Sequence, residues 1–224
     1  MRTVLQSSLQ PRKKPIQTRS ALTVEAIFEA TIQVLLRHGP EQFTTTRVAK
    51  RAGVSVGTLY QYYPNKQSLL FAVLERHLNL VIRAVERACR ENHHRPLETM
   101  VAAVVHAYVS AKLDQADASV ALHSAASELD GEALVARLAK RARSAMSTML
   151  KTAPEIGSQD VDFPVLMLMS AMAGATRAVL MAGAPPLMVR NLRKHLILLS
   201  LAYLRVSIAV ANRPIPAYLR GTDL

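Results

Sequence analysis

The chain has 224 residues, half of them hydrophobic but only 4% aromatic, and its apolar residues are mainly Ala, Val, Leu, Ile and Met. This composition favours packed helices over a β-sandwich or barrel. A formal net charge of +12 indicates a polyanionic partner, either nucleic acid or an anionic membrane. The single cysteine excludes an internal disulfide and a cysteine-based zinc site, and it is typical of a reducing compartment.

The positive charge is concentrated in the first third of the chain. Residues 1–68 carry 10 Lys and Arg against 3 Asp and Glu, so the polyanion is expected to bind there, and residues 1–20 are a predicted flexible basic arm. No stretch without a charged residue, including the very apolar one at 163–176, is longer than 14 residues. A membrane-spanning helix needs about 20 predominantly apolar residues. Since no apolar signal region follows the basic N-terminus either, we expect no membrane partner and a cytoplasmic location.

Two short helices are predicted after a first helix at about 22–38, which Gly39 and Pro40 end. Thr44 is a predicted N-cap, and Phe43 and Val48 occupy the positions of a hydrophobic staple. This second helix ends at Gly53. Ser55 then caps a third helix over 56–62. Two short helices joined across a tight turn predict a helix-turn-helix.

The rest of the chain is also predicted to be helical. Asn65 caps a long helix from 66 to about 90, and further helices are expected at about 96–113 and 118–128, after Asp130, and at about 162–182 and 187–211. The predicted fold is therefore all-α with about nine helices. We divide it into a basic arm (1–20), a helix-turn-helix domain (21–66) and a helical body (67–224).

A helix that reads the major groove needs a face of short and polar side chains, with phosphate-binding groups around it. The third helix and its surroundings meet this need, whereas Tyr63 is expected to be a core residue. The predicted DNA-binding residues are Thr45, Thr46, Arg47, Ser55, Val56, Gly57, Thr58, Tyr60, Gln61, Tyr62 and Lys66.

The body of the chain shows no recognised catalytic motif, and neighbouring His93 and His94 are not a metal signature, so no enzyme activity, cofactor or metal is predicted. Polar groups dispersed among apolar residues suit a pocket for a small apolar effector, neutral or anionic. The candidates for lining it are Met100, His106, Tyr108, His123, Ser127, Met169 and Arg177. Arg177 is also interpreted as a buried structural cation near a dimer seam. Cations around Cys89 could lower the pKa of its thiol and make it redox-sensitive.

The last two predicted helices are apolar on too many sides for the surface of a monomer. We therefore expect an isologous homodimer through them. The predicted seam residues are Leu168, Ala171, Ala175, Leu196, Leu199 and Tyr203.

The segment 43–69, FTTTRVAKRAGVSVGTLYQYYPNKQSL, closely resembles the DNA-binding signature of the TetR/AcrR family of transcriptional repressors. The resemblance lies in the Thr-rich start, Val-Ala-x-x-Ala-Gly-Val-Ser, Gly-Thr-Leu-Tyr-x-Tyr-Tyr and the Lys before a long helix. One departure is Gln67, where the family often has an acidic residue. The resemblance implies a homodimer with one DNA-binding head per chain, a helical ligand-binding body and a four-helix dimer interface.

The sequence thus predicts a ligand-responsive, dimeric repressor that binds a palindromic double-stranded DNA operator and is released by its effector. The sequence leaves three alternatives. One is a helical-bundle enzyme with a DNA-tethering head, which the missing catalytic motif disfavours. Another is a peripheral membrane protein, which lacks a basic amphipathic helix with aromatic anchors. The third is an activator or a redox-responsive regulator acting through Cys89.

Overall fold

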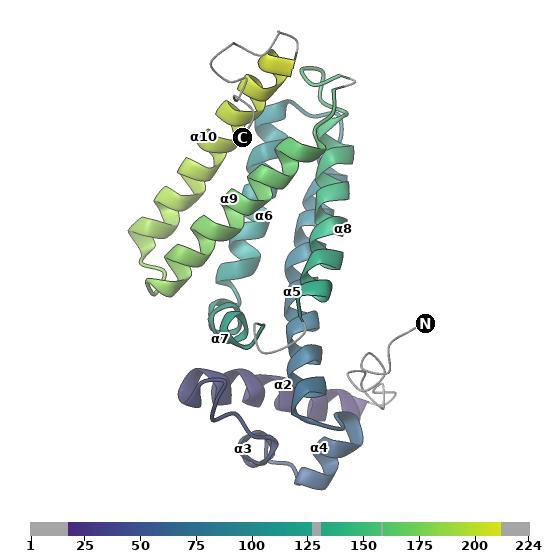
Figure 1. Ribbon diagram of the computed structural model, residues 1–224, viewed down its shortest axis with the longest axis vertical. Coiled ribbons are helices and arrows are strands. Elements are labelled where there is room, and N and C mark those ends of the chain that lie inside the picture. Colours follow the sequence, from purple (N-terminus) through teal and green to yellow (C-terminus); the bar gives the residue numbers. More distant parts are fainter. Residues whose placement is uncertain (1–17, 127–130, 158, 212–224) are drawn as a thin grey trace, which may run out of the picture. The chain divides into compact units, whose positions relative to one another are not determined.

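The computed structural model describes residues 18–126, 131–157 and 159–211. Within these ranges it contains nine α-helices and no strand, which confirms the all-α fold (Figure 1). The helices are α2 (Thr18–His38), α3 (Thr45–Ala52), α4 (Val56–Tyr62), α5 (Lys66–Glu91), α6 (Leu97–Leu113), α7 (Ala116–Ala126), α8 (Glu132–Leu150), α9 (Asp162–Met181) and α10 (Pro186–Ala211).

The observed boundaries differ little from the predicted ones. α2 begins at Thr18 and not near residue 22, because the residues from Thr18 to Ala21 include no glycine or proline that would stop a helix. The end of the predicted basic arm is therefore helical, and its residues 1–17 lie outside the described part of the chain, as does the predicted cap Asp130.

The chain divides into two compact units. The first comprises the described residues within 1–80 and 113–138, and the second those within 81–112 and 139–224. This division differs from the predicted boundary at residue 66, because the start of α5, α7 and the first turns of α8 join the helix-turn-helix. Three helices contribute residues to both units: α5, α8 and, by its last residue Leu113 alone, α6.

The core of the first unit forms around the aromatic side chains of Phe28 and Tyr63. Their ring centroids are 5.8 Å apart, and both side chains are almost completely buried. The Arg76 guanidinium of α5 lies over the Phe28 ring at 5.0 Å from its centroid and pairs with Glu25 at 2.5 Å. This cluster joins α2, the end of α4 and the start of α5, and so fixes the segment on which α4 is presented.

The second unit contains the antiparallel hairpin of α9 and α10 (Figure 1). Leu168 and Met172 of α9 and Leu196 and Leu204 of α10 are buried within this single protomer. Arg193 of α10 donates to the Ser110 hydroxyl of α6 at 3.1 Å, which ties the hairpin to the rest of the unit.

The opposite faces of α9 and α10 expose many large apolar side chains. They are Phe163, Leu166, Met167 and Met181 of α9 and Leu187, Met188, Leu198, Leu199, Val206 and Val210 of α10. By length and apolar composition alone, α9 could cross a membrane, which the count of uncharged residues did not predict. This is weak evidence for a span, since an apolar helix in the core of a globular protein passes the same test.

A tight turn at Gly53 is a strong conformational requirement of the fold. Gly53 follows α3 with a φ of 69°, in the left-handed region that residues with a Cβ rarely adopt. We predict that Gly53→Ala lowers the free energy of unfolding by about 1–2 kcal/mol. Urea unfolding measures this as a lower midpoint at an unchanged slope.

The matched control is Gly57→Ala. Gly57 has a helical backbone, and a Cβ placed there would meet only the Ser55 hydroxyl, at an ordinary 3.7 Å. Equal unfolding midpoints for Gly53→Ala and the wild type would contradict the claim that this turn requires a glycine.

Candidate nucleic-acid interface

Local hydrogen bonds hold the start and the end of α3. The Thr44 hydroxyl accepts from the backbone N–H of Arg47 at 3.3 Å, which confirms the predicted cap, and Phe43 and Val48 are buried beside it. At the other end, the N–H of Val54 donates to the carbonyl of Ala49 at 3.0 Å. The turn into α4 is thus closed by main-chain contacts that follow from the left-handed glycine.

The start of α4 is held by Ser55. Its hydroxyl accepts from the backbone N–H of Thr58 at 2.9 Å and lies 2.8 Å from the Thr58 hydroxyl. Leu59 is the buried residue of α4 and anchors the helix to the core. A helix of seven residues is unstable in water without such contacts. Its cap and its anchor therefore leave the rest of its surface available.

Tyr60 links α4 to the first turn of α3. Its hydroxyl lies 3.0 Å from the hydroxyl of Thr45, whose side chain is only 8% exposed. Thr45 was predicted to contact DNA, but its side chain turns inward and positions Tyr60. Tyr60 itself is 41% exposed, whereas Tyr63 is 3% exposed and is a core residue, as predicted.

The remaining predicted DNA-binding residues form an accessible surface of the first unit. Thr46, Arg47, Ser55, Gly57 and Gln61 are exposed, and Val56, Thr58 and Tyr62 are half-buried. This surface carries the short and polar side chains that a groove-reading helix requires. Arg47 also donates to the backbone carbonyl of Gln42, so its guanidinium is held beside the start of α3.

Lys66 is held by its own chain. Its ammonium donates to the Pro40 carbonyl at 3.1 Å and lies 5.7 Å from the centre of the Phe43 ring. Asn65 caps α5 as predicted, because its side chain accepts from the N–H of Ser68 at 2.7 Å. Lys66 therefore fixes the loop before α3 to the start of α5, and its contact with a DNA phosphate stays a prediction.

Comparison with known proteins matches both parts of the chain to one family. Residues 27–73 match the model of bacterial regulatory proteins of the tetR family, and residues 96–204 match a Tetracyclin repressor-like C-terminal domain. The chain belongs to the TetR family. The match covers the helix-turn-helix described above and most of the helical body.

The HTH-type transcriptional repressor KstR of Mycolicibacterium smegmatis is 39% identical to this TetR-family chain over 62 residues, which is 28% of this chain and 30% of KstR. The chain spans less than half the length of the curated relatives that it matches first.

Two solved structures share the fold. A putative transcriptional regulator from Pseudomonas aeruginosa is 21% identical with a TM-score of 0.66, and the match covers 84% of this chain and 91% of that one. LfrR from Mycobacterium smegmatis, solved with proflavine, is 21% identical with a TM-score of 0.54, covering 80% and 96%.

The predicted effector-binding residues lie in different environments. Met100 is fully buried, Tyr108 and Met169 are half-buried, and His106, His123 and Arg177 are exposed. His123 belongs to the first unit and the other five to the second. Ser127 lies outside the described residues. Arg177 was interpreted as a buried cation near the dimer seam; in the single protomer it lies on the exposed face of α9, and its burial at the seam stays a prediction.

The sequence pointed to Tyr108 as a candidate pocket residue but not to its neighbour on α6, Lys112. Tyr108 and Lys112 are one turn apart on α6, so their side chains project from the same face. Burial raises the pKa of Tyr108 to about 12 and lowers the pKa of Lys112. Lys112 could not be singled out from the sequence, since a lysine near the end of a helix is usually solvated.

The predicted seam residues are also only partly accessible. Leu168 and Leu196 are each 3% exposed in the single protomer, so they have almost no surface to bury against a second copy. That part of the prediction is wrong. Ala171, Ala175 and Tyr203 are half-buried, and Leu199 is 48% exposed among the apolar side chains of α10.

The thiol of Cys89 contradicts the redox hypothesis. Cys89 is 1% exposed, and burial, with Glu86 as a smaller cause, raises its pKa to about 12, although Arg90 opposes the shift. The nearby cations therefore do not produce a reactive thiolate.

Among the described residues, no group of three His, Cys, Asp or Glu side chains is placed to hold a metal ion.

We predict that Gly57→Ala separates stability from DNA binding. The substitution replaces a helical glycine without a clash, so it should raise the free energy of unfolding by about 0.5–1 kcal/mol. If DNA approaches the α4 backbone at Gly57, the added methyl group should weaken operator binding by about tenfold or more, equivalent to about 1.4 kcal/mol. Fluorescence anisotropy with a labelled operator measures the affinity, and wild-type affinity would exclude close approach at Gly57.

We predict that Cys89 is unreactive in the folded chain. With a pKa of about 12, its thiolate fraction at pH 8 is on the order of 10⁻⁴. A thiol reagent should therefore react at least about 100-fold more slowly with the folded chain than with the chain in urea. Rapid labelling of the folded chain, together with loss of DNA binding that Cys89→Ser prevents, would restore the redox hypothesis.

Proposed function

We propose that this TetR-family chain is a ligand-responsive, dimeric repressor that binds a palindromic DNA operator. The observation that carries the proposal is the surface of α4, which is capped by Ser55, anchored by Leu59 and braced by the Tyr60–Thr45 hydrogen bond. These contacts use one side of the helix and leave Gly57 and Gln61 exposed. Val56, Thr58 and Gln61 read base edges, and Gly57 lets the helix backbone approach the groove closely, while Thr46, Arg47, Tyr60, Tyr62 and Lys66 contact phosphates.

Two copies pair through the exposed apolar faces of α9 and α10. Ten large apolar side chains are exposed there in the single protomer, and such a surface is costly in water. A two-fold interface buries the same surface of both copies. The dimer then presents two copies of α4 to half-sites about 34–36 Å apart, one helical turn of DNA.

The effector is a small, largely apolar molecule, neutral or anionic, bound in the helical body. Tyr108 and Lys112 supply a hydroxyl donor and a partly desolvated ammonium on one face of α6, which suits an acidic or hydrogen-bonding group. The proflavine complex of LfrR supports binding of a small molecule by this fold. Because α5 contributes residues to both units, an effector that changes its tilt changes the spacing of the two α4 helices and releases DNA.

The chain works in the cytoplasm, without a membrane partner and without catalysis. Arg177 lies on the exposed face of α9, within the part of the chain that would cross a bilayer, and a charge at that depth is costly. TetR-family relatives of this chain are regulators, and no observation on the described residues favours an enzyme.

Selection of DNA sites by the purified protein tests the proposal. Randomised duplexes enriched over several rounds should converge on an inverted repeat. Saturating effector should then weaken binding of that operator about 5- to 150-fold, the range of allosteric coupling of 1–3 kcal/mol. Failure to enrich any sequence, or enrichment of a single asymmetric site bound by one protomer, would contradict the proposal.

We predict that Leu199→Asp produces monomers. The substitution places two charges in the proposed seam, one from each copy, and should weaken dimerisation by at least about 100-fold. The matched control is Val135→Asp on α8, since Val135 is 42% exposed and Leu199 is 48% exposed. Sedimentation equilibrium measures both variants. A Leu199→Asp dimer as tight as the wild type would exclude this face as the seam.

A further inference from the structure

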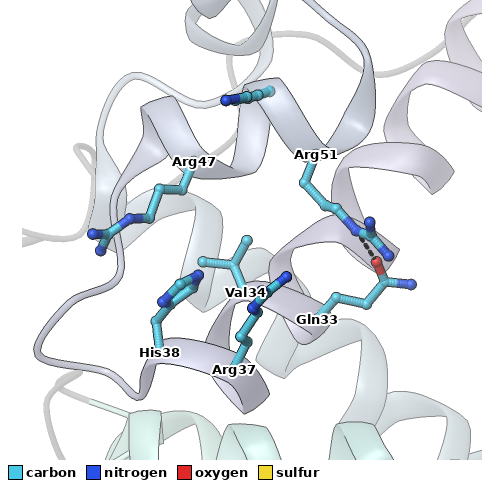
Figure 2. A pocket seen from close by; sticks show the side chains of 7 residues that line it. Gln33, Val34, Arg37, His38, Arg47 and Arg51 are labelled. Carbon is cyan, nitrogen blue, oxygen red and sulfur yellow. Dashed lines mark hydrogen bonds between the residues drawn. The ribbon is translucent and has the colours of Figure 1, made fainter.

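A basic hollow lies between α2 and α3, in the first unit. Its volume is about 480 Å³, and it is lined by Gln33, Val34, Arg37 and His38 of α2 and Arg47, Lys50 and Arg51 of α3. In Figure 2, Arg37 and His38 extend from α2 towards α3, and Arg47 and Arg51 extend from α3 at its two sides. We call this hollow the α2–α3 cationic pocket.

The pocket collects positive charge without a carboxylate among its lining residues. Four of the seven lining residues are Lys or Arg, and all four are exposed. Arg51 donates to the side-chain oxygen of Gln33 at 2.5 Å, and the Gln33 amide donates to Glu29 at 3.1 Å. These two hydrogen bonds fix the Gln33 amide. The Glu29 carboxylate bonds to Gln33 but is not part of the pocket lining.

Favourable interactions with helix dipoles explain only part of this arrangement. Arg37 and His38 lie in the last turn of α2, and Lys50 and Arg51 lie in the last turn of α3, where cations are favoured. Each dipole acts on its own helix, however, and gives no reason for the two sets of cations to share one hollow. Like charges in one hollow repel, and an anion held among them removes that cost.

We propose that the α2–α3 cationic pocket binds a phosphate group of the DNA duplex outside the base pairs that α4 reads. The proposal rests on the function proposed above. The first turn of α3 carries Thr46 and Arg47, and its last turn carries Lys50 and Arg51. These eight residues are about 12 Å long, whereas one strand rises about 3.4 Å per nucleotide. One DNA strand can therefore contact α3 at more than one phosphate.

The exposure of the cations favours a polyanion over a free phosphate ion. Exposed cations are well hydrated and screened, so a small anion gains little there. DNA phosphates instead bind with release of condensed counterions, and the guanidinium fork of Arg37 matches two phosphate oxygens. The pocket thus enlarges the DNA footprint without adding sequence specificity.

Two duplexes that differ in length test the proposal. One is the selected operator cut to its palindrome, and the other carries about 10 further base pairs of arbitrary sequence at each end. For the wild type, the slope of log affinity against log salt should be steeper on the long duplex by about 0.9 for each added phosphate, or about 1.8 per dimer. The Arg37→Gln/Lys50→Gln double variant should lose this difference and bind the short duplex as the wild type does.

The control variant removes two exposed cations of the body, Arg87→Gln and Lys140→Gln, and should keep the wild-type slopes. Thermal unfolding checks that both double variants fold. Wild-type slopes for Arg37→Gln/Lys50→Gln would overturn the proposal, and equal weakening on both duplexes would place the phosphate within the palindrome instead. If the wild type selects no operator at all, the proposed function fails and this inference fails with it.

Titration with pyrophosphate, followed by amide shifts of residues 33–51, separates the two sources of phosphate. We expect weak, non-saturating shifts at moderate salt. Saturable binding that the double variant abolishes, together with equal salt slopes on both duplexes, would assign the pocket to a free anion and overturn the DNA assignment.

Discussion

The short helix α4 depends on contacts with the residues around it. Seven residues cannot sustain a helix in water, because too few hydrogen bonds compensate for the lost backbone entropy. The Ser55 cap, the buried Leu59 and the Thr45–Tyr60 hydrogen bond supply what is missing. All of these contacts come from one side or from the ends. The opposite side is therefore held rigidly but remains open, as recognition of a rigid duplex requires.

The open side of α4 also bears on the presence of a glycine at position 57. A glycine in a helix is usually destabilising, and neither a positive φ nor crowding within the protein requires one here. Under the proposed function, the residue is explained by DNA that approaches the helix backbone closely at this position. Gly53 is the opposite case, because its left-handed backbone is part of the turn itself.

The helix-turn-helix could be predicted because its signals are local. Thr44, Ser55 and Asn65 cap the helices that follow them, and a cap depends only on the next three or four residues. The inward turn of Thr45 could not be predicted in this way, since its hydrogen-bond partner Tyr60 is 15 residues later in the chain.

The body illustrates the same limit. α9 is apolar on most sides, so its periodicity did not tell the face that packs within the protomer from the face that is exposed. Leu168 was therefore assigned to the seam although it is buried within the protomer, whereas Arg177 does lie on the exposed face. Cys89 was judged from its charged neighbours in sequence, whereas burial determines the pKa of its thiol. The α2–α3 cationic pocket likewise depends on residues that meet only in the folded unit.

Hydrogen exchange of the full chain, with and without its selected operator, tests most directly whether α4 and the start of α3 form the DNA interface. Bound DNA should slow backbone exchange in peptides covering residues 44–62. A duplex of unrelated sequence at the same salt should have a much smaller effect. Protection confined to α9 and α10, with exchange in α4 unchanged by the operator, would contradict this assignment.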